Sequence, residues 1–209
     1  MERVKIHIGY NLSRCGPEQA MLRACLADEG DSIMPHKILA AIDGTDHGIR
    51  TARRAAEEAR RMDAELILLH TFSPRELTND ELDYAEKRCG SDFRKLVSGG
   101  VLSQYSHEDK ASPPTIKSFI EARDNFFRIY GEDILDRASE QAFETGLDEV
   151  STLLEEGDPC QTVLNTAREE NVDMIVIGKS DHSAIANFFL GNKVKKIMNE
   201  ADRTVLTVD

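Results

Sequence analysis

The chain has 209 residues, of which 26 are Lys or Arg and 38 are Asp or Glu, so its formal net charge is −12. This length fits one large domain, or an ordinary domain with additions. The hydrophobic share of 40% and the charged share of 31% are typical of a globular chain. The acidic excess argues against non-specific binding to nucleic acid or to anionic membranes, because both attract a basic face.

The sequence also predicts a cytoplasmic protein. No apolar run approaches the ~18–20 residues that cross a bilayer, and the first residues alternate charged with apolar side chains, unlike a signal peptide. The cysteines are widely spaced and form no Cys-x-x-Cys pair or Cys/His cluster, so we expect free thiols and no metal site. They are Cys15, Cys25, Cys89 and Cys160.

Residues 1–36 are expected to form an N-terminal extension. Val4, Ile6, Ile8 and Tyr10 recur at every second position, which is typical of a strand, and a weakly helical stretch follows. Gly30-Asp31-Ser32 then separates the extension from the rest of the chain.

Strands and helices alternate through most of the remaining chain. The five predicted strands, rich in β-branched residues or Leu, are 37–42, 65–71, 149–154, 173–177 and 204–208. Apolar residues recur every three or four positions between them, which is typical of helices. This alternation predicts an α/β fold: a three-layer, doubly wound, mainly parallel five-stranded sheet with helices on both faces. The predicted domain covers 37–209.

A helical insert, 73–130, interrupts this domain after the second core strand. A structureless loop of such length would be unusual in a compact domain. Its apolar spacing predicts helices over 79–97 and 115–130, and it holds seven of the twelve aromatic residues. We therefore expect these helices to bury aromatic faces against the core, the N-terminal extension or a partner.

Several short motifs mark one edge of the predicted sheet. Asp43-Gly44-Thr45 follows the first core strand, and ligands of open α/β sheets bind at the carboxyl ends of strands. Asp158 and Pro159 have the residue types of a helix N-cap and first helical position. Gly178 closes a strand and Gly191-Asn192 opens the last helix, where backbone N–H groups can receive an anion. His70, at the end of an apolar strand, is predicted to be structural.

This ordered set resembles the universal stress protein family. The matching motifs are Asp43-Gly44-Thr45, Leu69-His70, Gly157-Asp158-Pro159 and Ile177-Gly178, followed by a final helix and strand. The resemblance covers about 115 residues of the core and leaves out 1–36 and 73–130. It implies a stress-response protein with a Rossmann-like fold, and similar proteins dimerise through the last strand. We therefore expect a homodimer through 204–208, with Thr204, Leu206 and Val208 on the pairing strand.

The resemblance also implies a site for ATP or another adenine nucleotide, which this chain would hold in degenerate form. The ATP-binding members read Gly-x-x-Gly, nine residues, then Gly-Ser/Thr. Gly178 and Gly191 match that pattern, but Asp181 and Asn192 depart from it. Asp181 would place a carboxylate near the phosphates, whereas Asn192 can still donate to a phosphate oxygen. The full candidate set is Ile42, Asp43, Thr71, Gly178, Asp181, Gly191, Asn192 and Lys193.

We expect a non-catalytic regulatory or ligand-binding protein, with no catalytic residue assigned. One alternative is an ATP-hydrolysing member of the same superfamily, for which Asp43 and Asp181 are the obvious carboxylates. Another is an interaction protein that binds a partner through the insert 73–130. A third alternative concerns the site alone: Gly178 and Gly191 would then be only turn and cap glycines.

Overall fold

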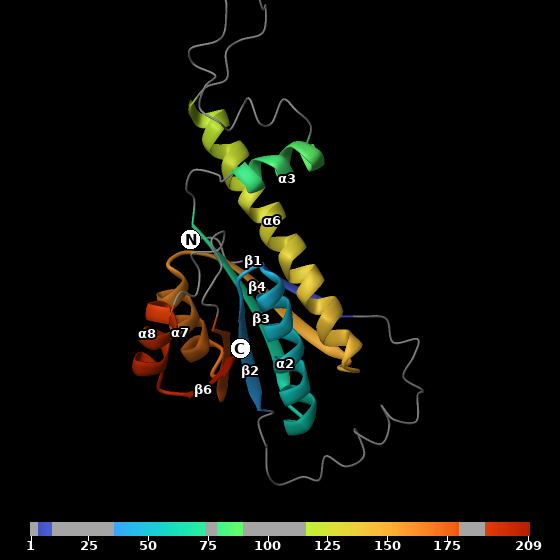
Figure 1. The fold of residues 1–209 in the computed structure, drawn as a ribbon, viewed down its shortest axis with the longest axis vertical. Helices are drawn as coiled ribbons and strands as arrows, with labels where there is room; N and C mark the ends of the chain where they lie inside the picture. The colour runs from blue at the N-terminus through green and yellow to red at the C-terminus, as the bar shows by residue number, and fades with distance from the viewer. Residues whose placement is uncertain (1–3, 10–35, 74–78, 90–115, 180–190) are drawn as a thin grey trace, which may run out of the picture.

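The computed structural model describes residues 4–9, 36–73, 79–89, 116–179 and 191–209, and its centre is one six-stranded sheet (Figure 1). The strand order is β1-β4-β3-β2-β5-β6. The strands are β1 (Val4–Gly9), β2 (Lys37–Ile42), β3 (Glu65–Phe72), β4 (Glu149–Glu156), β5 (Met174–Gly178) and β6 (Thr204–Val208). Strands β2 to β6 are parallel, as predicted, and the N-terminal strand β1 joins the same sheet antiparallel to β4.

Helices cover both faces of the sheet, which confirms the doubly wound architecture. Helices α2 (Asp46–Met62) and α6 (Ile116–Glu144) pack over one face, and α7 (Pro159–Glu169) and α8 (Gly191–Glu200) over the other (Figure 1). Alternate residues of each strand serve the two cores: in β2, Ala40 faces α2 and Leu39 faces α7 and α8. Because both faces are buried, the strands read as nearly continuous apolar runs.

Local sequence signals set the ends of two core helices. The Thr45 hydroxyl accepts a hydrogen bond from the Gly48 N–H and caps α2, while Asp63 ends it in the left-handed conformation. The Asp158 carboxylate accepts from the Gln161 N–H at 3.1 Å, with Pro159 at the first turn of α7. The predicted cap at Asp158 is therefore confirmed.

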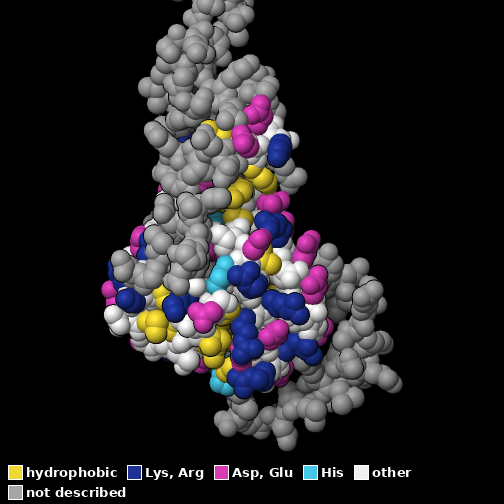
Figure 2. Space-filling view, viewed as in Figure 1, with side chains coloured by type: hydrophobic (Ala, Val, Ile, Leu, Met, Phe, Trp, Pro, Cys, Tyr) yellow, Lys and Arg dark blue, Asp and Glu magenta, His cyan; other side chains and the backbone are white. Residues whose placement is uncertain are grey.

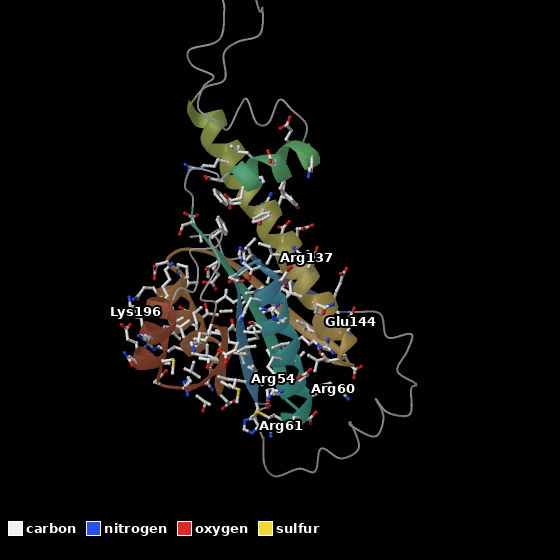
Figure 3. The ribbon with its side chains drawn as sticks, viewed as in Figure 1. Arg54, Arg60, Arg61, Arg137, Glu144 and Lys196 are labelled. Carbon is white, nitrogen blue, oxygen red and sulfur yellow. The ribbon has the colours of Figure 1, made fainter. Side chains whose placement is uncertain are left out.

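The solvent face of α2 carries many arginines, and the same helix neutralises part of their charge (Figure 2). The Glu58 carboxylate is nearly buried and contacts Arg54 and Arg61, each at 2.6 Å. Arg60 donates to the carbonyl of Thr145, in the turn that follows α6 (Figure 3). The pairs with Glu58 thus lie within α2, and Arg60 connects the helix to the turn after α6.

The insert differs from the prediction in its second half. The sequence predicted one helix over 115–130 and a separate core helix after it, but both belong to the continuous 29-residue helix α6. Gly131, at the expected boundary, lies inside α6. A Cβ at Gly131 would come within 2.5 Å of Leu154 Cδ1. The glycine lets α6 lie close to the sheet, and the packing gained offsets the ~1 kcal/mol helix penalty of a glycine.

The first half of α6 extends beyond the carboxyl ends of the strands, where α3 (Asn79–Cys89) crosses it (Figure 1). Phe126 and Phe127 of α6 are almost fully buried there. Phe72, the last residue of β3, stacks on Phe127 with ring centroids 6.2 Å apart. Tyr84 of α3 meets Phe126 edge to face at 6.3 Å. The predicted burial of an aromatic face is therefore confirmed for these residues.

Candidate functional site

The candidate site lies where three neighbouring parallel strands end. Strand β2 pairs with β3 on one side and β5 on the other, so Asp43, Thr71 and Gly178 meet at one edge of the sheet. The chain runs outward from β2 through β3 to β4, and then returns to β5 on the opposite side. This reversal is the topological switch point at which open α/β sheets bind ligands.

Asp43 is a buried and hydrogen-bonded polar group at this edge. Its side chain is 8% exposed, and Oδ1 accepts from the Thr45 N–H at 3.1 Å and from the Thr45 hydroxyl at 2.6 Å. Thr45 in turn accepts from the Gly48 N–H at 3.1 Å. The other carboxylate oxygen, Oδ2, has no hydrogen-bond partner within the described residues. One oxygen therefore fixes the side chain, and the other is left for a ligand.

The side chain of His70, on β3, is hydrogen-bonded to the end of β2. Its Nδ1 lies 2.7 Å from the carbonyl oxygen of Ile42, which can only accept, so Nδ1 carries the proton. Burial lowers the pKa of His70, against smaller raising effects of the Ile42 hydrogen bond and of Asp43. His70 therefore stays neutral near pH 7 and holds the end of β2 against β3, which agrees with the predicted structural role.

Gly178 has a packing reason for being glycine. A Cβ there would come within 2.5 Å of His47 Nδ1 and 2.8 Å of Thr51 Oγ1, both on the first turns of α2. The backbone of β5 thus lies directly against α2. His47 was not among the predicted site residues. Its position just after Asp43-Gly44-Thr45 was the one signal in the sequence that could have pointed to it.

The insert borders the same edge. Thr71 is buried and is followed by Phe72, whose ring stacks on Phe127 of α6. Gly131 of α6 lies so close to His70 that an added Cβ would be 3.1 Å from its ring. The first half of α6 therefore stands beside the candidate site, on the β3 side.

The structure places only part of the predicted phosphate loop. Asp181 lies outside the described residues. Gly191 and Asn192 form the start of α8, as expected, and Lys193 follows them half-buried, with its carbonyl 3.7 Å from Cys160 Sγ. Burial is the main reason why the pKa of the Cys160 thiol is raised. The structure thus brings Ile42, Asp43, Thr71 and Gly178 together and does not test Asp181.

The described residues contain no group of three His, Cys, Asp or Glu side chains arranged to hold a metal ion. No helix in the described part of the chain is both long and apolar enough to span a membrane.

The fold and the position of the site define a Rossmann-like α/β protein. The family model described as "Universal stress protein family" matches residues 34–96 and 99–209, so the chain belongs to the universal stress protein family. It is 27% identical over 175 residues to "Universal stress protein YxiE" of Bacillus subtilis, covering 84% of this chain and 99% of that one.

Solved structures agree on the fold. Universal stress protein UspA from Lactobacillus plantarum superposes with a TM-score of 0.53 at 15% identity, covering 83% of this chain and 97% of that one. A universal stress protein crystallised in complex with cAMP superposes with a TM-score of 0.51 at 18% identity, covering 83% of this chain and 96% of that chain.

Proposed function

We propose that this protein is a non-catalytic regulatory member of its family that binds an adenine nucleotide at the ends of β2, β3 and β5. The observation that carries the proposal is Asp43: a nine-tenths-buried carboxylate at the switch point, oriented by Thr45, with Oδ2 left unpaired. Oδ2 itself is not fully buried, so a ligand can reach it and donate a hydrogen bond to it. The neighbouring fold solved with cAMP supports a nucleotide of this class.

We further propose that Asp181 weakens the phosphate part of this site. Two like charges ~4 Å apart at an effective dielectric constant of ~20 repel by roughly 4 kcal/mol. Solvent and Lys193 would screen much of that repulsion. We therefore expect the native chain to bind ATP weakly and to bind adenosine, which lacks phosphates, without this penalty.

Calorimetry with ATP and adenosine tests both statements. Asp43→Asn keeps the shape of the side chain but removes its charge, and it should weaken both ligands by about tenfold, or ~1.4 kcal/mol. The double variant Asp181→Gly with Asn192→Ser should strengthen ATP by about tenfold and leave adenosine unchanged. Asp148→Asn, an exposed carboxylate before β4, is the matched control. Native protein that binds neither ligand would refute the proposed function.

The absence of catalysis is a separate claim with a separate test. Incubation of the native protein with ATP and Mg²⁺ should release no phosphate above a blank. Steady turnover that Asp43→Asn abolishes would favour the alternative of an ATP-hydrolysing member.

We also propose a homodimer that pairs β6 with its symmetry mate. Strand β6 is the last strand of the sheet, and Leu206 and Val208 on it are only half-buried. An apolar edge strand readily pairs with a second copy. The Val208 carbonyl accepts from the Lys179 N–H, so Leu206 and Val208 use their backbone groups toward β5, and Thr207 presents its own to the free edge. Thr207→Pro removes a backbone donor from this edge and should shift sedimentation from dimer to monomer. A native monomer at micromolar concentration would refute the proposal.

A further inference from the structure

Within the described part of the chain, His47 is a half-buried side chain whose two ring nitrogens the fold itself does not pair. It is the second residue of α2, and its ring lies against Gly178, where an added Cβ would meet Nδ1 at 2.5 Å and Cε1 at 2.8 Å. Both ring nitrogens, Nδ1 and Nε2, are buried and have no hydrogen-bond partner among the residues that the structure describes.

Two polar neighbours, Thr51 and Asp43, do not pair with the ring of His47. The Thr51 hydroxyl, which also lies against Gly178, donates to the carbonyl of His47 itself at 2.9 Å. Asp43 makes its hydrogen bonds to Thr45, through Oδ1. A buried imidazole with neither nitrogen paired lowers the stability of the empty protein, because water no longer satisfies the ring. A residue with such a cost needs a second reason to be there.

We infer that His47 is a ligand-contacting residue that donates a hydrogen bond to a phosphate oxygen of the bound nucleotide. The inference rests on the proposed function and adds a residue to its site. His47 lies on the β5 side of Asp43, next to the strand end from which the chain continues toward α8. It also lies in the first turn of the 17-residue helix α2, whose N-terminus favours a negative group.

The same geometry explains how the contact forms. In the empty protein the ring rests against Gly178, with its nitrogens covered. A phosphate at this strand end offers the acceptor that the ring lacks, so the hydrogen bond gained on binding favours a ring turned toward the ligand. His47 thus lowers the stability of the empty protein and increases its affinity for the phosphate.

A His47→Leu variant separates this role from a structural one. Leucine fills similar space without polar atoms, so the melting temperature of the ligand-free protein should rise or stay unchanged. ATP affinity, measured by calorimetry, should fall about tenfold, and adenosine affinity should change less than about twofold. His47→Gln keeps a donor and should retain ATP affinity within about threefold. His36→Gln, at the opposite end of the sheet, should change neither affinity.

The other outcomes overturn the inference in distinguishable ways. A lower melting temperature with unchanged ATP affinity would make His47 a structural residue. Equal losses for ATP and adenosine would place the contact at the base or ribose and not at a phosphate. Equal ATP affinity of the native protein and His47→Leu would refute this inference and leave the proposed function intact. Native protein that binds neither ligand would refute both.

Discussion

Helices α2 and α6 cover the same face of the sheet, but they depend on different kinds of information. Helix α2 begins at a threonine cap, ends at a left-handed Asp63 and keeps its small apolar face on the sheet throughout. Helix α6 is 29 residues long: its second half packs on the face of the sheet, while its first half packs with α3 and with Phe72 at the end of β3. The residues at the ends of α2 therefore set its limits, whereas the length and course of α6 depend on the residues that it packs against.

The difference matters because both helices border the candidate site. The first turns of α2 place Thr45 against Asp43 and His47 against Gly178. The middle of α6 places Gly131 against His70, and Phe127 against Phe72. The edge at which a nucleotide would bind is therefore held on one side by a capped helix start and on the other by an aromatic cluster.

The largest expected effect is the loss of an aromatic ring from α6. Phe126 is 2% exposed and contacts Tyr84, Phe127 and Tyr130. Phe126→Ala should lower the free energy of unfolding by about 3–4 kcal/mol, through lost burial and a cavity. Denaturant unfolding followed by circular dichroism measures this effect.

Ile129→Ala is the matched control on the same helix. Ile129 is 37% exposed, so this variant should change stability by less than about 0.5 kcal/mol. A change of under 1 kcal/mol for Phe126→Ala would show that the insert unfolds separately from the sheet, and that the aromatic cluster does not support the site.

The next largest effect is expected from substitution of Gly131, the residue at which α6 passes close to the sheet. Gly131→Val forces a branched side chain toward Leu154 and His70, and should cost about 2–3 kcal/mol by overpacking. Gly131→Ala should cost less, about 1 kcal/mol, because the gain in helix propensity offsets part of the clash. Thermal or denaturant unfolding compares the two variants. Equal stability of the alanine, valine and native proteins would mean that α6 can move away freely.

A smaller effect is expected at the start of α2. Thr45→Ala removes the helix cap and the hydroxyl hydrogen bond to Asp43 Oδ1, while the backbone N–H bond to the same oxygen remains, and it should cost about 1–2 kcal/mol. Thr45→Ser keeps the hydroxyl and should stay within about 0.5 kcal/mol of the native protein. Unfolding curves for both variants decide the point: equal losses would show that the methyl group of Thr45, and not its hydroxyl, stabilises this turn.

These contrasts also explain what the sequence could predict. The five parallel strands follow from apolar runs and turn residues, and the Asp158 cap from local chemistry. The continuity of α6 did not follow, because glycine usually weakens a helix and only the contact with Leu154 explains Gly131. Asp43 was predictable from its place after a strand. His47 was not, because its meaning comes from Gly178, 131 positions away in the chain (178 − 47) and adjacent only in the fold.

The smallest effect concerns pH, at the point where α6 meets the sheet. Burial lowers the pKa of His70 in the folded protein below 6.5, the ordinary value of a histidine side chain and the one that we take for the unfolded chain. The unfolded state therefore binds the proton more readily, so the stability that the neutral ring contributes is present above pH 6.5 and is lost as the pH falls toward the folded pKa. The free energy of unfolding should decrease between pH 7.5 and pH 5.5.

His70→Asn keeps an N–H donor for the Ile42 carbonyl but cannot titrate, so the decrease in its free energy of unfolding should be smaller. If the free energy of unfolding changes with pH identically in the native protein and in His70→Asn, protonation of His70 does not contribute to the pH dependence of stability.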